Sequence, residues 1–251
     1  TTSTGNVSEV AVFVNGIEVA TGLRNITIRN GNIAAFKGSG IKIGYGCNNI
    51  NLQNLTISNC LFNGIYILGT STSGQDVSEV TIDNCIVSGT IGSAGTTDAV
   101  GLRIEYGWDI IVSDSMFARN VASNSADDSF GVYINASTNI IFNSCDASGN
   151  DGQNAYGFSL QGATRGCVFS NCTANGNYGR LSATGVGYGF HLSTAHANIF
   201  ENCSATSNFG AIEGSGFRLA SSEYNYFKNC TALNNTGCSS GSTEAHGGRG
   251  F

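Results

Sequence analysis

The sequence predicts an all-β protein, a right-handed parallel β-helix in which a single chain winds through about eight stacked coils. Two repeats predict it. Asn-Cys, or a close variant, returns every 25 to 31 residues along the 251-residue chain, and a Gly-apolar-x-apolar motif returns once per coil. Repeats of this length with alternating apolar residues are typical of solenoids, in which each unit buries its inner face only against its neighbours.

The Asn-Cys repeat predicts one strand of each coil. Apolar residues stand three positions before each Cys or Ser and two positions after it, so the flanking side chains alternate between interior and surface. The aligned positions are Cys60, Cys85, Ser115, Cys145, Cys172, Cys203 and Cys230. We expect them to form one inward column.

The Gly-apolar-x-apolar repeat predicts a second strand in each coil. Its copies begin at Gly40, Gly64, Gly101, Gly131, Gly157, Gly189 and Gly216. We expect Gly and Asn at the strand ends to supply the left-handed backbone angles that turn a corner. Loops of variable length then lead to the next coil along one edge of the stack.

Two sets of asparagines follow the same period. One set precedes the Cys column and the other lies five residues after it: Asn59, Asn84, Asn171, Asn202 and Asn229, then Asn120, Asn150, Asn177, Asn208 and Asn235. Amides stacked on parallel strands hydrogen-bond to one another along the stack. The sequence therefore predicts two asparagine ladders.

The nine cysteines predict free thiols rather than a disulfide framework. Stacked neighbours have parallel Cβ vectors, which is poor geometry for a bridge. We expect the column cysteines to act as small buried hydrophobic residues, with Cys238 in a loop.

Two other architectures are less consistent with the sequence. Abundant Gly, Asn, Thr and β-branched residues disfavour a helical solenoid. A β-propeller would pair antiparallel hairpins, whereas columns that repeat in one chain direction favour parallel pairing. The propeller stays the alternative fold.

Composition is uniform and favours one β-helix domain over residues 1–251, which we expect to be a fragment of a longer chain. Charged residues make up 11% of the chain, against roughly 25% in ordinary domains. A net charge of −6 with scattered basic residues argues against nucleic acid as a partner. We expect no membrane span, since no apolar run reaches about 18 residues, and no metal site or cofactor, since neither Cys-x-x-Cys nor Cys-His spacing occurs.

The segment 22–31, Gly-Leu-Arg-Asn-Ile-Thr-Ile-Arg-Asn-Gly, and the repeats after it resemble the right-handed parallel β-helix superfamily. That superfamily includes pectate-lyase-like enzymes, carbohydrate-binding and sugar-hydrolase solenoids, and phage tailspikes. The resemblance covers nearly the whole chain. It implies the fold, but no single activity, because one fold hosts many functions.

The third position of the Gly-apolar-x-apolar repeat predicts an outward column, here called the outer stripe. It reads Lys42, Tyr66, Arg103, Tyr133, Ser159, His191 and Arg218. Aromatic and cationic side chains about 4.8 Å apart offer stacking faces and donors to an extended glycan or another acidic polymer. We therefore predict ligand-binding roles for all of these residues except Ser159; the alternative is a strand face that only keeps the protein soluble.

Acid–base catalysis on a sugar would need two carboxylates near one groove, or a carboxylate with a basic partner. Glu105 follows Arg103 on the same strand face, and Asp128 precedes the next strand. We therefore take Glu105, Asp128 and Arg103 as candidate catalytic residues, with Asp98 and Asp127 nearby. Acids in a polar loop also serve solvation alone, and the signature motifs of pectin hydrolases and lyases are absent.

The regular stack, with few charged constellations, favours a non-catalytic, extracellular or surface-displayed solenoid. It would act as a fibre segment or adhesin that binds a polysaccharide along the outer stripe. A polysaccharide lyase, hydrolase or epimerase is the first alternative. The second is a purely structural protein that self-associates end to end or laterally, because open solenoids expose strand edges.

Overall fold

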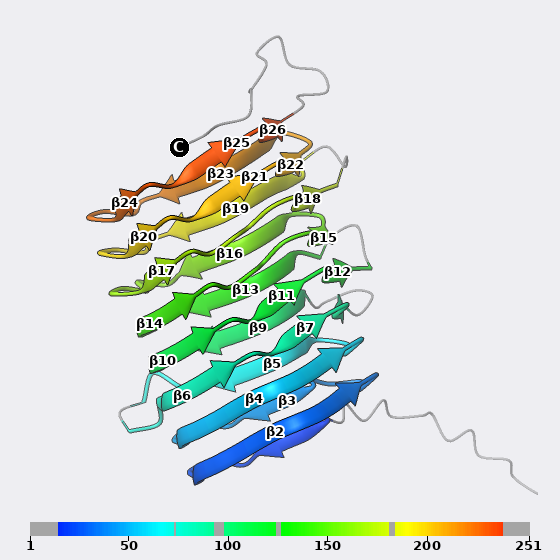
Figure 1. Ribbon diagram of the computed structural model, residues 1–251, viewed down its shortest axis with the longest axis vertical. Helices are drawn as coiled ribbons and strands as arrows, with labels where there is room; N and C mark the ends of the chain where they lie inside the picture. Colours follow the sequence, from blue (N-terminus) through cyan, green and yellow to red (C-terminus); the bar gives the residue numbers. More distant parts are fainter. Residues whose placement is uncertain (1–14, 73, 93–97, 124–126, 181–183, 238–251) are drawn as a thin grey trace, which may run out of the picture.

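The computed structural model describes residues 15–72, 74–92, 98–123, 127–180 and 184–237, and these residues form strands and turns with no helix. Successive coils lie directly above one another and pair in parallel (Figure 1). The predicted all-β parallel β-helix is confirmed. Within the described ranges, no helix is long and apolar enough to cross a membrane.

The first sheet has eight parallel strands. Its strands are β1 (Ile17–Val19), β3 (Ile41–Ile43), β5 (Asn63–Leu68), β9 (Ala99–Glu105), β13 (Ser129–Asn135), β16 (Ala155–Gln161), β19 (Val186–Ser193) and β23 (Glu213–Ala220). Inward side chains along these strands are buried and aliphatic or aromatic.

The second sheet lies across the interior from the first. Its strands are β2 (Arg24–Ala34), β4 (Asn48–Ser58), β6 (Val77–Asp83), β10 (Gly107–Ser113), β14 (Thr138–Asn143), β17 (Val168–Ser170), β20 (Ile199–Glu201) and β24 (Tyr226–Lys228), with β7 (Ile86–Ser88) and β11 (Met116–Ala118) joined to it through β4. The short strands β21 (Ser204–Thr206) and β25 (Thr231–Leu233) pair with each other.

A third sheet of six short strands closes the coils. It contains β8 (Ile91–Gly92), β12 (Val121–Ala122), β15 (Asp151–Gly152), β18 (Tyr178–Gly179), β22 (Phe209–Gly210) and β26 (Thr236–Gly237). About six coils therefore have a strand on all three sides, fewer than the eight strands of the first sheet.

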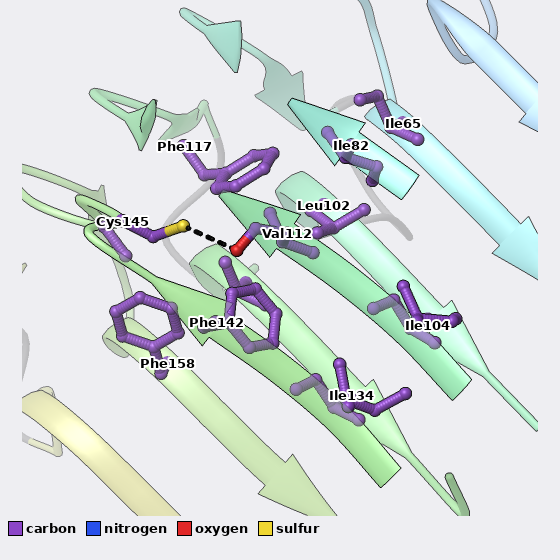
Figure 2. Packing of buried hydrophobic residues seen from close by; sticks show 14 of the residues in the cluster. Ile65, Ile82, Leu102, Ile104, Val112, Phe117, Ile134, Phe142, Cys145 and Phe158 are labelled. Atoms are coloured by element: carbon purple, nitrogen blue, oxygen red, sulfur yellow. Dashed lines mark hydrogen bonds between the residues drawn. The ribbon is translucent and has the colours of Figure 1, made fainter. Parts of the chain in front are cut away.

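The interior changes from aliphatic to aromatic along the stack. Figure 2 shows isoleucine, leucine and valine side chains giving way to Phe142 and Phe158. Beyond them, phenylalanines stack in parallel from coil to coil with ring centroids 4.8 to 5.0 Å apart, in two ladders: Phe142, Phe169, Phe200 and Phe227, and Phe158, Phe190 and Phe217. Rings of the two ladders meet edge to face, a favourable aromatic geometry.

The cysteine column is confirmed from Cys85 onward, but the predicted place of Cys60 is wrong. Ile57 pairs with Val87, and Leu52 pairs with Ile82, so Leu55 occupies the column in that coil. The reason is that β4 continues past the corner residue Asn54, which has a left-handed φ of 52°. Sequence spacing alone therefore misaligned this coil.

The described cysteines are free thiols, as predicted, and all but Cys230 are buried. Each column thiol lies within hydrogen-bonding distance of a backbone carbonyl; Cys145 Sγ, for example, lies 3.4 Å from the Val112 oxygen (Figure 2). These contacts satisfy a weak donor inside the core. Cys238 lies outside the described residues.

The asparagine ladder that begins at Asn120 is confirmed and buried. Each Nδ2 donates to the Oδ1 of the next coil at 2.8 to 2.9 Å, from Asn120 through to Asn235. The other set lies at an exposed corner, where Asn84 donates to Asn54 and Asn229 donates to Asn202. Asn59 does not belong to this corner set, because the sequence alignment misplaced it together with Cys60.

Asn and Gly do supply left-handed backbone angles, as predicted, but the glycines involved are others, such as Gly149 and Gly176, and not those of the motif. Asn is the commonest residue at the left-handed positions, as at Asn84 and Asn171, whereas the motif glycines have no positive φ. A Cβ at Gly157 would lie 2.6 Å from both Ala174 Cβ and the Gly189 oxygen. These positions are therefore glycine because neighbouring chain segments approach too closely for a side chain.

Candidate functional site

The outer stripe lies in one column on the outer face of the first sheet. The strand register aligns Lys42, Tyr66, Arg103, Tyr133, Ser159, His191 and Arg218 one above another. Glu18 begins the column, and its carboxylate accepts a hydrogen bond from Lys42 Nζ at 3.1 Å. Sequence analysis missed Glu18, although Gly16-Ile17-Glu18-Val19 carries the same motif.

Arg103 is the centre of the stripe. Its guanidinium carbon lies 5.5 Å from the centroid of the Tyr66 ring and 5.1 Å from that of Tyr133, on the coils to either side. These distances fall within cation–π range. The cation is thus held between two aromatic faces, with its side chain 31% exposed.

Glu105 fixes both Arg103 and Tyr66. Its Oε1 accepts from Arg103 Nε at 3.1 Å and Nη2 at 2.7 Å, and its Oε2 accepts from the Tyr66 hydroxyl at 2.7 Å. Burial, and then the bond to Glu105, raise the pKa of the Tyr66 hydroxyl. Tyr66 therefore stays protonated and remains a donor.

Asp128 belongs to a short ladder at the edge of the first sheet. Asp98 Oδ1 accepts from the Asp128 backbone N–H at 3.1 Å, and Asp128 Oδ1 accepts from the Asn154 side-chain amide at 2.8 Å. Asn154 Oδ1 accepts in turn from the Val186 N–H at 3.1 Å. These polar side chains tie consecutive coils together.

Both carboxyl groups of this ladder, those of Asp98 and Asp128, have raised pKa values. Burial, followed by the negative charge of Asp98, raises the pKa of Asp128 to about 6. Burial also raises the pKa of Asp98, while the nearby Arg103 lowers it. Asp127 is only 7% exposed, and its Oδ2 has no hydrogen-bond partner within the described residues.

The predicted catalytic residues fall into two neighbouring groups. Arg103 and Glu105 form an ion pair, while Asp128 lies with Asp98 and Asn154. Asp98 couples the two groups electrostatically, because the positive charge of Arg103 lowers the pKa of the Asp98 carboxyl. In the part of the chain that the structure describes, no hydrogen bond joins Glu105 to Asp128.

The stripe changes character beyond Tyr133. Ser159 is fully buried and interrupts the stripe, and its Oγ lies 3.3 Å from His191 Nδ1. Burial, followed by the charge of Arg218, lowers the pKa of His191 to about 4. Arg218 is paired with Glu213 at 3.2 Å, and Glu213 also accepts from the Tyr188 hydroxyl at 3.1 Å.

A second, smaller apolar cluster lies on this outer face, and sequence analysis missed it. Phe130 and Tyr156 stack with centroids 4.7 Å apart, and Tyr156 meets Tyr188 edge to face at 5.7 Å. Val100 completes the buried cluster. Each of these residues directly precedes a motif glycine, so the position before the glycine carried the signal.

The described residues include no group of three or more His, Cys, Asp or Glu placed to hold a metal ion. The arrangement instead offers aromatic faces, a fixed guanidinium and half-buried carboxyls. Such groups bind polar, hydroxyl-rich or acidic ligands by hydrogen bonds and ring packing.

Several solved structures are similar to this one. Pectate lyase Pel9A is 17% identical, with a TM-score of 0.55, over 82% of this chain and 55% of its own. The enzymatically active domain of bacteriophage CBA120 tailspike protein 2 is 14% identical, with a TM-score of 0.45, over 92% and 38%. PfbA, a surface adhesin of Streptococcus pneumoniae, is 13% identical, with a TM-score of 0.38, over 84% and 61%.

The likeness to Pel9A shows the fold alone, and this chain spans about half the length of that protein. No curated protein matches the sequence. The model of the family described as the right handed beta helix region matches residues 45–232, well over half of the chain. The chain therefore belongs to the right handed beta helix family.

Proposed function

We propose that this protein binds an extended glycan along the outer stripe and acts as a non-catalytic fibre segment or adhesin, extracellular or displayed on a surface. The observation that carries the proposal is the position of Arg103 between the rings of Tyr66 and Tyr133. The cation and both rings are held before any ligand arrives, which reduces the entropy lost on binding.

An acidic polysaccharide fits this surface best. Arg103 has donors left after pairing with Glu105, because guanidinium carries five N–H groups. The two rings supply flat apolar faces, and Lys42 and Arg218 place further cationic groups in the same column, each paired with a carboxylate as Arg103 is. Sugar hydroxyls and carboxylates can be bound by such groups at several neighbouring coils.

Binding to immobilised acidic and neutral polysaccharides tests the proposal. We expect an acidic polymer to bind, and we expect Arg103→Gln with Tyr133→Ala to weaken binding at least tenfold, about 1.4 kcal/mol. Lys228→Gln is the matched control, since Lys228 is an exposed base on the second sheet. Equal loss in the control, or no binding to any polymer, would contradict the proposal.

A polysaccharide-cleaving activity is the second candidate, and one observation favours it. Asp128 has a pKa raised to about 6 beside Asp98, whose carboxyl responds to Arg103. A carboxyl that titrates near neutrality suits general acid–base catalysis. Pel9A, by its name a pectate lyase, shares this fold.

Mass spectrometry of polysaccharides after incubation decides between the two candidates. Shortened or unsaturated products that disappear in both Asp128→Asn and Glu105→Gln would establish an enzyme. Binding without products would leave the non-catalytic function as the explanation.

A further inference from the structure

A different surface lies at the corner between the first and second sheets. Trp108, the only tryptophan in the chain, stands near the start of β10 and is 42% exposed. The register places only polar residues in its column on neighbouring coils: Arg24, Asn48, Ser78 and Thr138. No aromatic residue stands beside Trp108 in its column within the described coils, so ladder packing does not explain it.

Two hollows flank the Trp108 side chain. One has a volume of about 430 Å³ and faces the earlier coils, where Arg24, Asn48 and Ser78 line it. The other has a volume of about 310 Å³ and is lined by Tyr106, Thr138 and Asn139 on the later side. Trp108 and Asp76 line both hollows.

The connection 69–76 places Asp76 there. It joins β5 to β6 and is eight residues long, whereas the other connections between these two sheets have one to six. Its described residues project from the stack beside β6 (Figure 1). The Gln75 oxygen accepts from the Gly46 N–H at 3.2 Å, which anchors the end of the connection to the previous coil.

The polar groups around Trp108 are available to a ligand. Within the described residues, neither the Asp76 carboxylate nor the Arg24 guanidinium has a hydrogen-bond or ion-pair partner, and no aromatic ring stacks on Trp108. Binding sites of small polar ligands commonly combine an aromatic wall with a few polar side chains that fix orientation. The features here match that description.

We infer that Trp108, Asp76 and Arg24 form a binding site for a neutral pyranose unit, distinct from the outer stripe. The C–H face of a pyranose packs on a flat indole, and its hydroxyls can donate to Asp76 and accept from Arg24. Because the hollow is bordered by one negative and one positive side chain, it favours a ligand without net charge. An acidic sugar would lie against the Asp76 carboxylate.

Intrinsic fluorescence tests this site directly, because Trp108 is the only indole in the protein. The intact chain is titrated with neutral tetrasaccharides of glucose, galactose, mannose and xylose, each up to about 50 mM, which detects dissociation constants in the millimolar range. We expect a saturable change in emission with at least one of them. No change with any of the four would overturn the inference.

Matched variants locate the binding. We expect Asp76→Asn to weaken the saturable response at least roughly fivefold, whereas Asp114→Asn, which removes an exposed carboxylate that lines neither hollow, should leave it unchanged. Calorimetry on Trp108→Ala, checked for a native circular dichroism spectrum, should show no binding of the same saccharide. Retained binding in Trp108→Ala, or equal loss in the two aspartate variants, would contradict the assignment.

The outer-stripe variants separate this inference from the proposed function. Arg103→Gln with Tyr133→Ala should weaken binding of the acidic polymer at least tenfold and leave the Trp108 titration intact. Loss of both signals together would mean that a single surface binds both ligands, and the second site would be rejected.

Discussion

The outer faces of the first and second sheets rest on the same coil repeat but differ in chemistry. On the first sheet, half-buried charged residues have fixed partners, as Arg103 has in Glu105 and Arg218 in Glu213. On the second sheet, the corresponding column, here called the apolar row, is Ile111, Ile141, Val168, Ile199 and Tyr226. Stacking constrains the inward positions and leaves each outward column free to take its own function.

The two faces also differ in exposure. Ile111 is 43% exposed and Tyr226 is 55% exposed. Arg103 and Glu105 are more enclosed, although they are charged. Removing the partner of a partly buried charge destabilises the protein, whereas replacing an exposed apolar residue changes its stability little. The following predictions test this contrast, with the shared interior as the reference.

The largest effect should come from the interior that supports both faces. Phe169 is fully buried and stacks on Phe142 and Phe200. We expect Phe169→Ala to lower the free energy of unfolding by about 3–5 kcal/mol, through lost burial and an unfilled cavity. Tyr226→Ala, on the apolar row, is the control and should cost under about 1 kcal/mol in chemical denaturation. Similar costs would show that the outer row also acts as core.

A smaller effect is expected when the central charge pair is broken. Glu105→Ala leaves Arg103 without its carboxylate and Tyr66 without its acceptor, so we expect the free energy of unfolding to fall by about 1–3 kcal/mol. Glu18→Ala removes the exposed pair with Lys42 and should cost less than about 0.5 kcal/mol. Equal losses in the two variants would mean that the enclosure of Arg103 has no energetic consequence.

Inward positions could be predicted from sequence because they repeat. The apolar residues on either side of the Cys column and the buried asparagine ladder follow from a fixed offset to a motif, and so does the outward column of the outer stripe. The alignment failed at Cys60, where β4 runs through a corner and shifts the register. A local change in where a coil turns cannot be read from spacing alone, because both alignments bury apolar residues.

The partners of the site residues could not be predicted in the same way. The ion pair of Arg103 with Glu105 joins two outward residues of one strand, a contact that spacing allows but does not require. Asp128 was proposed as a catalytic acid, yet its Oδ1 accepts from Asn154 on the next coil. Sequence analysis did not identify Trp108 as a site residue, because the hollows beside it depend on the long connection 69–76.

The ionisation of Asp128 should make the stability of the protein depend on pH. Its pKa is about 6 in the folded state and about 4 when unfolded, so its contribution to the free energy of unfolding decreases from pH 4 to 6 and is constant above. In Asp128→Asn this decrease in the free energy of unfolding with rising pH is absent. Relative to wild type, we expect the variant to gain about 1–2 kcal/mol between pH 4 and 7, after discounting for solvent exposure.

Urea denaturation at several pH values measures this difference. The buried His191, whose pKa is about 4, titrates in an overlapping range but is present in both proteins, so its contribution cancels. A difference that stays constant with pH would show that Asp128 is not perturbed by burial and Asp98.

The smallest effect on stability should come from the apolar row. We expect Ile111→Thr with Ile199→Thr to change the free energy of unfolding by less than about 0.5 kcal/mol per site, because both side chains are substantially exposed. The same variant tests lateral self-association, since contiguous exposed apolar surface marks contact sites. Light scattering measured over a range of protein concentrations should give a lower apparent mass for this variant than for wild type. Lys42→Thr on the outer stripe should leave the apparent mass unchanged. If the apparent mass of wild type is that of a single chain at every concentration, the apolar row does not mediate assembly, and the contrast between the two faces concerns ligand binding alone.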